Sequence, residues 1–176
     1  MDVIWKTVLW SQFGATIEMF ENAMRACPEE LWTAPMWNDP TMPPEFSEFW
    51  YIAYHTLFYL DLYLSGSVEG FIPPAPYNLD ELDPAGLLPE RTYTRDELRS
   101  YLEHCRLKCR GVIEQLTDAQ AERVCKFSWA KDGLSFVELL VDNMRHVQEH
   151  GAQLNMLLGQ SAGISTGWMA RVRDNH

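Results

Sequence analysis

Apolar residues in four separate segments of the chain recur every three or four positions, the spacing that places them on one face of an α-helix. In the third segment the interval alternates between four and three without a break from Leu98 to Leu116. The segments predict helices over about residues 2–26, 44–65, 95–116 and 136–158. The sequence therefore predicts an all-α protein built as a helical bundle.

Local signals mark several of the expected helix ends. Thr94 and Glu97 form a capping box before the third helix. Pro44 suits the first turn of the second helix, where a missing N–H costs nothing. Gly66 and Gly159 are expected to end the second and fourth helices, because glycine readily adopts the left-handed conformation that closes a helix.

The connecting segments are long and rich in turn residues. Residues 117–134 are expected to hold a short helical turn and an Asp132–Gly133 turn. The Pro-rich connector 66–93 could run back along a helix of about 30 Å, so that the second and third helices lie parallel. No internal repeat or second domain is visible, so residues 1–176 are expected to form one domain.

Composition limits the classes of function. The chain has 176 residues, 47% of them hydrophobic, and a net charge of −11, which suits one well-packed core. An acidic chain without a basic patch predicts no nucleic-acid and no membrane-surface partner. No targeting segment, no apolar run of membrane-spanning length and no C-x-x-C cysteine pair is present, so a cytoplasmic protein with reduced thiols is expected.

Polar residues occupy the middle of one face of the fourth predicted helix. This face reads Leu139, Asn143, His146, His150, Gln153 and Leu157. Histidines at positions i and i+4 project from adjacent turns, so both imidazoles can reach one ion. The spacing alone is a weak signal in a chain with five histidines, and it needs a third ligand from a facing helix.

His55 supplies that third candidate. It lies in the apolar second helix, where burying an imidazole without a partner costs about 1–3 kcal/mol. Three neutral imidazoles, His55, His146 and His150, would bind a divalent ion and leave positions open for water or substrate. Zinc, nickel, iron and copper suit such donors. Asn143 and Gln153, one turn to either side, are candidates to orient a ligand or substrate.

Plainer interpretations remain open for each group. His55 alone would more often be a hydrogen-bonded core histidine, and the pair on the fourth helix alone would more often be solvated. His104 is expected to be solvated, and Cys105 and Cys109 fit small buried hydrophobes. A carboxylate-bridged di-iron site is disfavoured because its Glu-x-x-His motif is absent. The acidic residues near the histidines do not fall on the site face, so no general base is assigned: these are Glu48, Asp142 and Glu149.

Two motifs give the chain a family resemblance. His55 in its hydrophobic helix and the run from His146 through His150 to Leu154 resemble the DinB-like family of metal-dependent enzymes, as does the segment 134–140. The resemblance implies a four-helix bundle of up-down-down-up topology with a long crossover between helices two and three. It also implies a three-histidine site for nickel or zinc, and a homodimer.

Characterised members of that family include transferases and isomerases that use low-molecular-weight thiols. The leading hypothesis is therefore a metal-dependent enzyme, such as a thiol-cofactor-dependent transferase acting on a small molecule. A non-catalytic metal- or small-ligand-binding bundle of a stress response is the alternative. A third interpretation is a helical bundle without metal. The connector 66–93 is longer than in a short generic member, so a substrate is not carried over by analogy.

Overall fold

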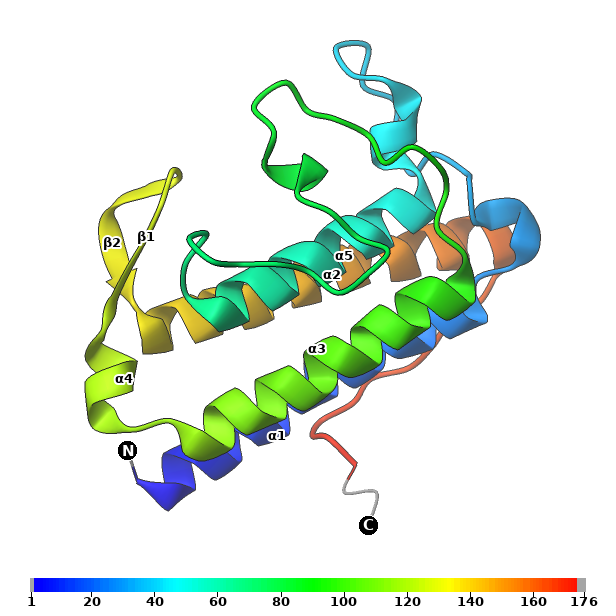
Figure 1. The fold of residues 1–176 in the computed structure, drawn as a ribbon. Coiled ribbons are helices and arrows are strands. Elements are labelled where there is room, and N and C mark those ends of the chain that lie inside the picture. The colour runs from blue at the N-terminus through cyan, green and yellow to red at the C-terminus, as the bar shows by residue number, and fades with distance from the viewer. Residues whose placement is uncertain (1, 174–176) are drawn as a thin grey trace.

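The computed structural model describes residues 2–173, which are mostly helical (Figure 1). The helices are α1 (Val3–Ala26), α2 (Phe49–Ser65), α3 (Arg95–Gln115), α4 (Asp118–Glu122) and α5 (Phe136–Ala162). Strands β1 (Val124–Phe127) and β2 (Ala130–Ser135) form a small antiparallel sheet, and short 3-10 turns cover Glu29–Leu31, Pro44–Ser47 and Asp80–Leu82. The all-α prediction is thus correct in broad terms, with one hairpin as the exception.

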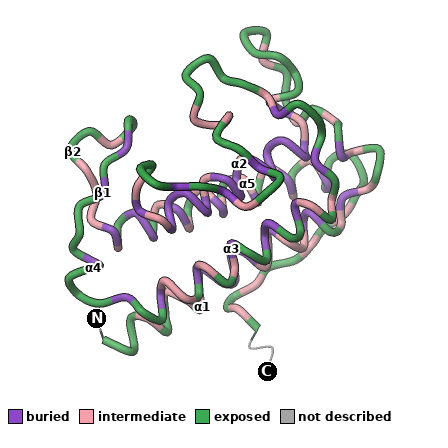
Figure 2. Tube along the Cα trace, viewed as in Figure 1, coloured by how far each residue is buried: buried purple, intermediate pink, exposed green. Residues whose placement is uncertain are grey.

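The core lies between the four long helices. Helix α1 packs against α3 and α5, and α2 packs against the same two helices. Each of the four contributes fully buried side chains to the centre, for example Phe13, Leu57, Leu102 and Leu154. The buried faces point inward in Figure 2, while the connectors are largely exposed. No helix in the described part of the chain combines the length and apolar character needed to cross a membrane.

Connector 66–93 brings the chain back along α2 before α3 begins (Figure 1). Tyr93, just before α3, contacts the ring of Trp50 in the first turn of α2. At the other end of these helices Lys108 of α3 donates a hydrogen bond to Ser65, the last residue of α2. The two helices therefore run in the same direction, as expected from the length of the connector.

The second helix begins later than expected. Residues Pro44–Ser47 form a separate 3-10 turn, and Glu48 is extended with ψ of 147°. The backbone amides of Phe49 and Trp50 donate to the carbonyls of residues 34 and 32. These bonds to a distant segment hold the chain in place ahead of α2. A proline near a helix start does not reveal such tertiary bonds, which is why the prediction of 44–65 was too long.

The fourth predicted helix, α5, ends later than expected. Gly159 lies inside it, and the left-handed residue that closes it is Gly163 with φ of 67°. The amide of Gly163 donates to the carbonyl of Gly159, and that of Ile164 donates to Leu158. Ile164 also packs against the core. The apolar contact after Gly163 favours that glycine as the stop.

The hairpin between α4 and α5 was not predicted. Short helix α4 matches the expected turn, but residues 124–135 then form two strands, paired from Val124 with Ser135 to Phe127 with Ala130. Asp132 and Gly133 lie within β2, so the prediction of a turn there was wrong. β1 alternates exposed and buried residues over only four positions, with Cys125 and Phe127 on the core side, and β2 shows no such alternation.

Candidate metal centre

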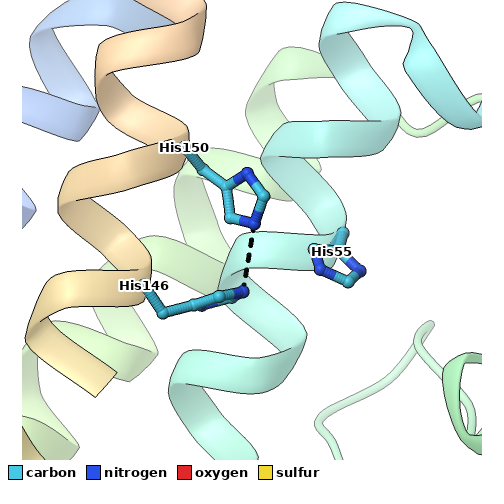
Figure 3. A group of neighbouring side chains, drawn as sticks. All are labelled: His55, His146 and His150. Carbon is cyan, nitrogen blue, oxygen red and sulfur yellow. Dashed lines mark hydrogen bonds between the residues drawn. The ribbon is translucent and has the colours of Figure 1, made fainter. Parts of the chain in front are cut away.

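Three imidazoles meet between α2 and α5 (Figure 3). His55 projects from α2, and His146 and His150 project from adjacent turns of α5. The ring of His55 lies 5.5 Å from that of His146 and 5.2 Å from that of His150, between centroids. Each ring offers one nitrogen, and these atoms lie within 4.8 Å of one another. The structure therefore brings together the three residues that the sequence singled out.

The pair on α5 already has the spacing of two ligands on one ion. The Nε2 atoms of His146 and His150 are 3.1 Å apart. Two nitrogens bound at about 2.1 Å with tetrahedral or octahedral angles would be about 3.0–3.4 Å apart. Two lone pairs at this distance repel each other unless a proton or a cation lies between them. Without a cation the two rings share a hydrogen bond, drawn dashed in Figure 3, and the same separation also fits two nitrogens bound to one cation.

Two of the rings are oriented through their second nitrogen. Nδ1 of His150 lies 2.7 Å from Oε1 of Gln153, and Nδ1 of His55 lies 2.8 Å from Oε2 of Glu81. Amide and carboxylate oxygens only accept, so each Nδ1 carries the proton and donates it. The Nε2 lone pair of each ring is then available to a cation.

Burial keeps the α5 pair neutral. Desolvation, followed by the neighbouring His150 and His55, lowers the pKa of His146 to about 3. Desolvation is also the main cause that lowers the pKa of His150. Metal ligands must be deprotonated, so these rings are in the required state at pH 7. Nδ1 of His146 is buried and has no hydrogen-bond partner among residues 2–173.

Asn143 and Gln153 differ in what they contact. Gln153 accepts a hydrogen bond from His150, which is the contact expected of a residue that orients a ligand. Asn143 is fully buried, and its Nδ2 donates to the carbonyl of Leu60 at 3.1 Å. Its amide therefore joins α5 to the backbone of α2, one turn from the imidazoles.

Glu81 is the site residue that sequence reasoning missed. It comes from connector 66–93, and its side chain is only 3% exposed. It is 26 positions from His55 in the sequence, and no spacing rule links a residue on a long connector to a helix. The three acidic residues considered from the sequence lie elsewhere: Glu48 accepts from Trp50, Asp142 accepts from Arg145, and Glu149 is exposed.

Aromatic rings surround the imidazoles. Tyr59 lies 4.8 Å from the ring of His55 and 5.9 Å from that of His146. Tyr63 contacts His146 and also the rings of Phe127 and Trp129 in the hairpin. These rings build an apolar wall, and the His55 side chain keeps 26% of its surface exposed beside it. One side of the cluster therefore remains accessible to solvent.

The remaining candidates lie outside the cluster. Cys105 and Cys109 are free and fully buried on α3, and burial raises the pKa of both thiols. They are small core residues, in agreement with the sequence. His104 is exposed on α3, as expected from the sequence, and its Nε2 lies 3.5 Å from Asp61. That partner was not expected.

The fold and the site together define a mostly helical protein with a cluster of three imidazoles between two of its helices. The family model of the DinB superfamily matches residues 12–154, a range that includes all three histidines. The chain therefore belongs to the DinB superfamily. Comparison with curated proteins found no match, and neither did comparison with solved structures.

Proposed function

We propose that the chain is a metal-dependent enzyme in which His55, His146 and His150 hold one divalent cation. Nickel and zinc are the leading candidates for the cation. The proposed reaction is the transfer of a low-molecular-weight thiol to or from a small-molecule substrate. The observation that carries the proposal is the convergence of three imidazole nitrogens within 4.8 Å from two separate helices.

The donor set suits this chemistry. Imidazole nitrogens favour borderline cations such as nickel and zinc, and three of them leave coordination positions free for other ligands. Such a cation, when bound, would lower the pKa of a coordinated thiol or water molecule, so that a thiolate or hydroxide would form at neutral pH. The exposed part of His55 supports access from solvent, and Tyr59 and Tyr63 would pack against an apolar part of the substrate.

Metal analysis of the untagged protein tests the site. The wild-type chain is expected to retain about one equivalent of nickel or zinc, and the His146→Ala/His150→Ala variant is expected to retain none. His104→Ala is the matched control, because it removes a histidine from α3 outside the cluster. Unchanged metal content in the double variant would refute the proposed ligands.

Thiol-transfer assays test the reaction. The metal-loaded protein is expected to accelerate the reaction of at least one low-molecular-weight thiol, such as glutathione, bacillithiol or mycothiol, with a panel of electrophiles. The double histidine variant should lose this acceleration. A metal-loaded protein that is inactive with every combination of thiol and electrophile would favour the alternative, a non-catalytic protein that binds metal or a small ligand.

The proposal includes the assembly of the molecule. We propose that the four long helices form a bundle of up-down-down-up topology and that two copies form a homodimer. The shared direction of α2 and α3 supports the topology. The exposed apolar residues Val3, Ile4, Trp5 and Val8 in the first turns of α1 support contact with a partner. Light scattering coupled to gel filtration should give twice the mass of the chain.

A further inference from the structure

Glu81 is a buried carboxylate that comes from a connector rather than from a helix. Its side chain is 3% exposed, and Oε2 accepts the hydrogen bond from Nδ1 of His55 at 2.8 Å. Its other oxygen, Oε1, is buried and has no hydrogen-bond partner among the described residues. Burying a carboxylate is costly, so a position held in this way calls for a role.

The backbone around Glu81 holds the carboxylate in place. Residues Asp80–Leu82 form a 3-10 turn, and the side chain of Asn78 accepts a hydrogen bond from the amide of Asp80. The carbonyl of Glu81 accepts a hydrogen bond from the hydroxyl of Tyr59 on α2 at 3.2 Å. Leu82 packs against the core. The connector is thus fastened to α2 at the histidine cluster itself.

The three imidazoles differ in what their Nδ1 atoms contact. Nδ1 of His55 faces the carboxylate of Glu81, Nδ1 of His150 faces the neutral amide of Gln153, and Nδ1 of His146 has no partner in the part of the chain described. A carboxylate that accepts from Nδ1–H fixes the tautomer and the orientation of the ring, and it makes Nε2 a better donor to a metal. Within residues 2–173, His55 is thus the one histidine of the three whose Nδ1 contacts a carboxyl group.

We propose that Glu81 is a positioning residue of the metal centre and that connector 66–93 is thereby part of this centre. Glu81 acts through His55: it holds the Nε2 lone pair toward the α5 pair and raises its affinity for the cation. This inference rests on the proposed function, because it assigns a partner to a proposed ligand. This role would make connector 66–93, which is distant in sequence from α5, a contributor to the histidine cluster.

The test compares the affinity for nickel and zinc of the wild-type protein with that of two variants, by competition with a chromophoric chelator. Glu81→Ala removes the acceptor and is expected to weaken binding by 10- to 100-fold. Glu81→Gln keeps an oxygen that can accept from Nδ1–H, so it should recover part of this loss. Glu90→Ala is the matched control, because it removes an exposed carboxylate from the same connector and should leave the affinity unchanged.

A second readout needs no metal. Nitrogen-15 NMR of the imidazoles in chelator-treated protein reports which ring nitrogen carries the proton. His55 should be protonated at Nδ1 in the wild-type protein and in Glu81→Gln, and it should become a mixture of tautomers in Glu81→Ala. If circular dichroism shows that Glu81→Ala does not fold, the metal affinity of Glu81→Gln tests the proposal instead. The proposal then requires that Glu81→Gln binds nickel and zinc more weakly than the wild-type protein.

The outcomes separate this inference from the function on which it rests. Wild-type affinity in every folded Glu81 variant would overturn the role of Glu81 and leave the three-histidine site intact. A wild-type protein that binds neither nickel nor zinc would overturn both. Weaker binding in Glu81→Ala, with partial recovery in Glu81→Gln, supports the inference.

Discussion

The three histidines show how environment sets the chemistry of identical side chains. His146 is the most strongly perturbed of them, because burial and two neighbouring imidazoles oppose its charge. His55 is oriented by the carboxylate of Glu81, and His150 by the amide of Gln153. At the residue scale, the site depends on keeping these rings neutral and aimed at one point.

The depressed pKa of His146 predicts a pH dependence of stability for the protein stripped of metal. The pKa is about 3 in the folded state and about 6.5 in the unfolded chain, so between these values the unfolded chain binds the extra proton. The free energy of unfolding should therefore fall as the pH drops from about 6.5 toward 3, and this contribution should be fully retained above 6.5. His146→Gln should flatten that slope by up to about 1.4 kcal/mol per pH unit. Urea unfolding of both proteins at several pH values measures this dependence. The same slope of unfolding free energy against pH in the wild-type protein and in His146→Gln would contradict the prediction.

At the scale of elements, tertiary bonds moved the ends of two helices away from the residues that sequence signals indicated. The start of α2 is displaced to Phe49 by backbone bonds to residues 32–34. The end of α5 is displaced to Ala162, because Ile164 docks on the core only when Gly163 turns the chain. Glycine permits a helix to end, but a contact beyond the glycine decides where it does.

Gly159 inside α5 and Gly163 just after its last residue should respond oppositely to substitution by alanine. Gly159 lies inside the helix and has room for a Cβ, with the nearest atom at 3.8 Å. Gly159→Ala should therefore raise the free energy of unfolding by about 0.5–1 kcal/mol. Gly163 has φ of 67°, which a Cβ disfavours, so Gly163→Ala should lower it by about 1 kcal/mol. Chemical denaturation of both variants measures these changes. A change of the same sign in both free energies of unfolding would argue that α5 does not end at Gly163.

A buried ion pair joins the parallel helices α2 and α3. Asp61 is 1% exposed and accepts hydrogen bonds from Lys108 and from the hydroxyl of Tyr101. Lys108→Met should lower the free energy of unfolding by about 3 kcal/mol, because it leaves a buried carboxylate without its cation. Arg145→Met, which breaks an exposed pair with Asp142, should change it by less than about 1 kcal/mol. Similar losses in thermal unfolding of the two variants would contradict this difference.

At the scale of the whole molecule, the histidine cluster joins two helices that are distant in sequence. A cation held by His55 on α2 and by the α5 pair would cross-link the folded state and bind the unfolded chain less well. Metal at about 100 times its dissociation constant should add about 2.7 kcal/mol to the free energy of unfolding, which raises the Tm by about 5–10 °C. Scanning calorimetry with and without chelator measures this shift. His146→Ala/His150→Ala should show none.

Much of the architecture was predictable because it depends on short-range patterns. The apolar spacing located the four long helices, and the capping box at Thr94 located the start of α3 correctly. The hairpin was not predicted, because an alternation over the four residues of β1 is too short a signal and the six residues of β2 show none. The spacing of His146 and His150 was visible in the sequence, since adjacent turns of one helix must place them side by side.

The sequence by itself determined which segments are helical and which two imidazoles share a helix face, because both follow from the 3.6-residue period of a single segment. Only the tertiary structure decided that the ring of His55 faces that pair and that Glu81 closes against it. These contacts join residues from different elements, and their distances depend on how α2, α5 and the connector pack together. No local pattern encodes that packing, so the sequence could propose His55 as the third imidazole of the cluster, but its contact with Glu81 became visible only in the folded molecule.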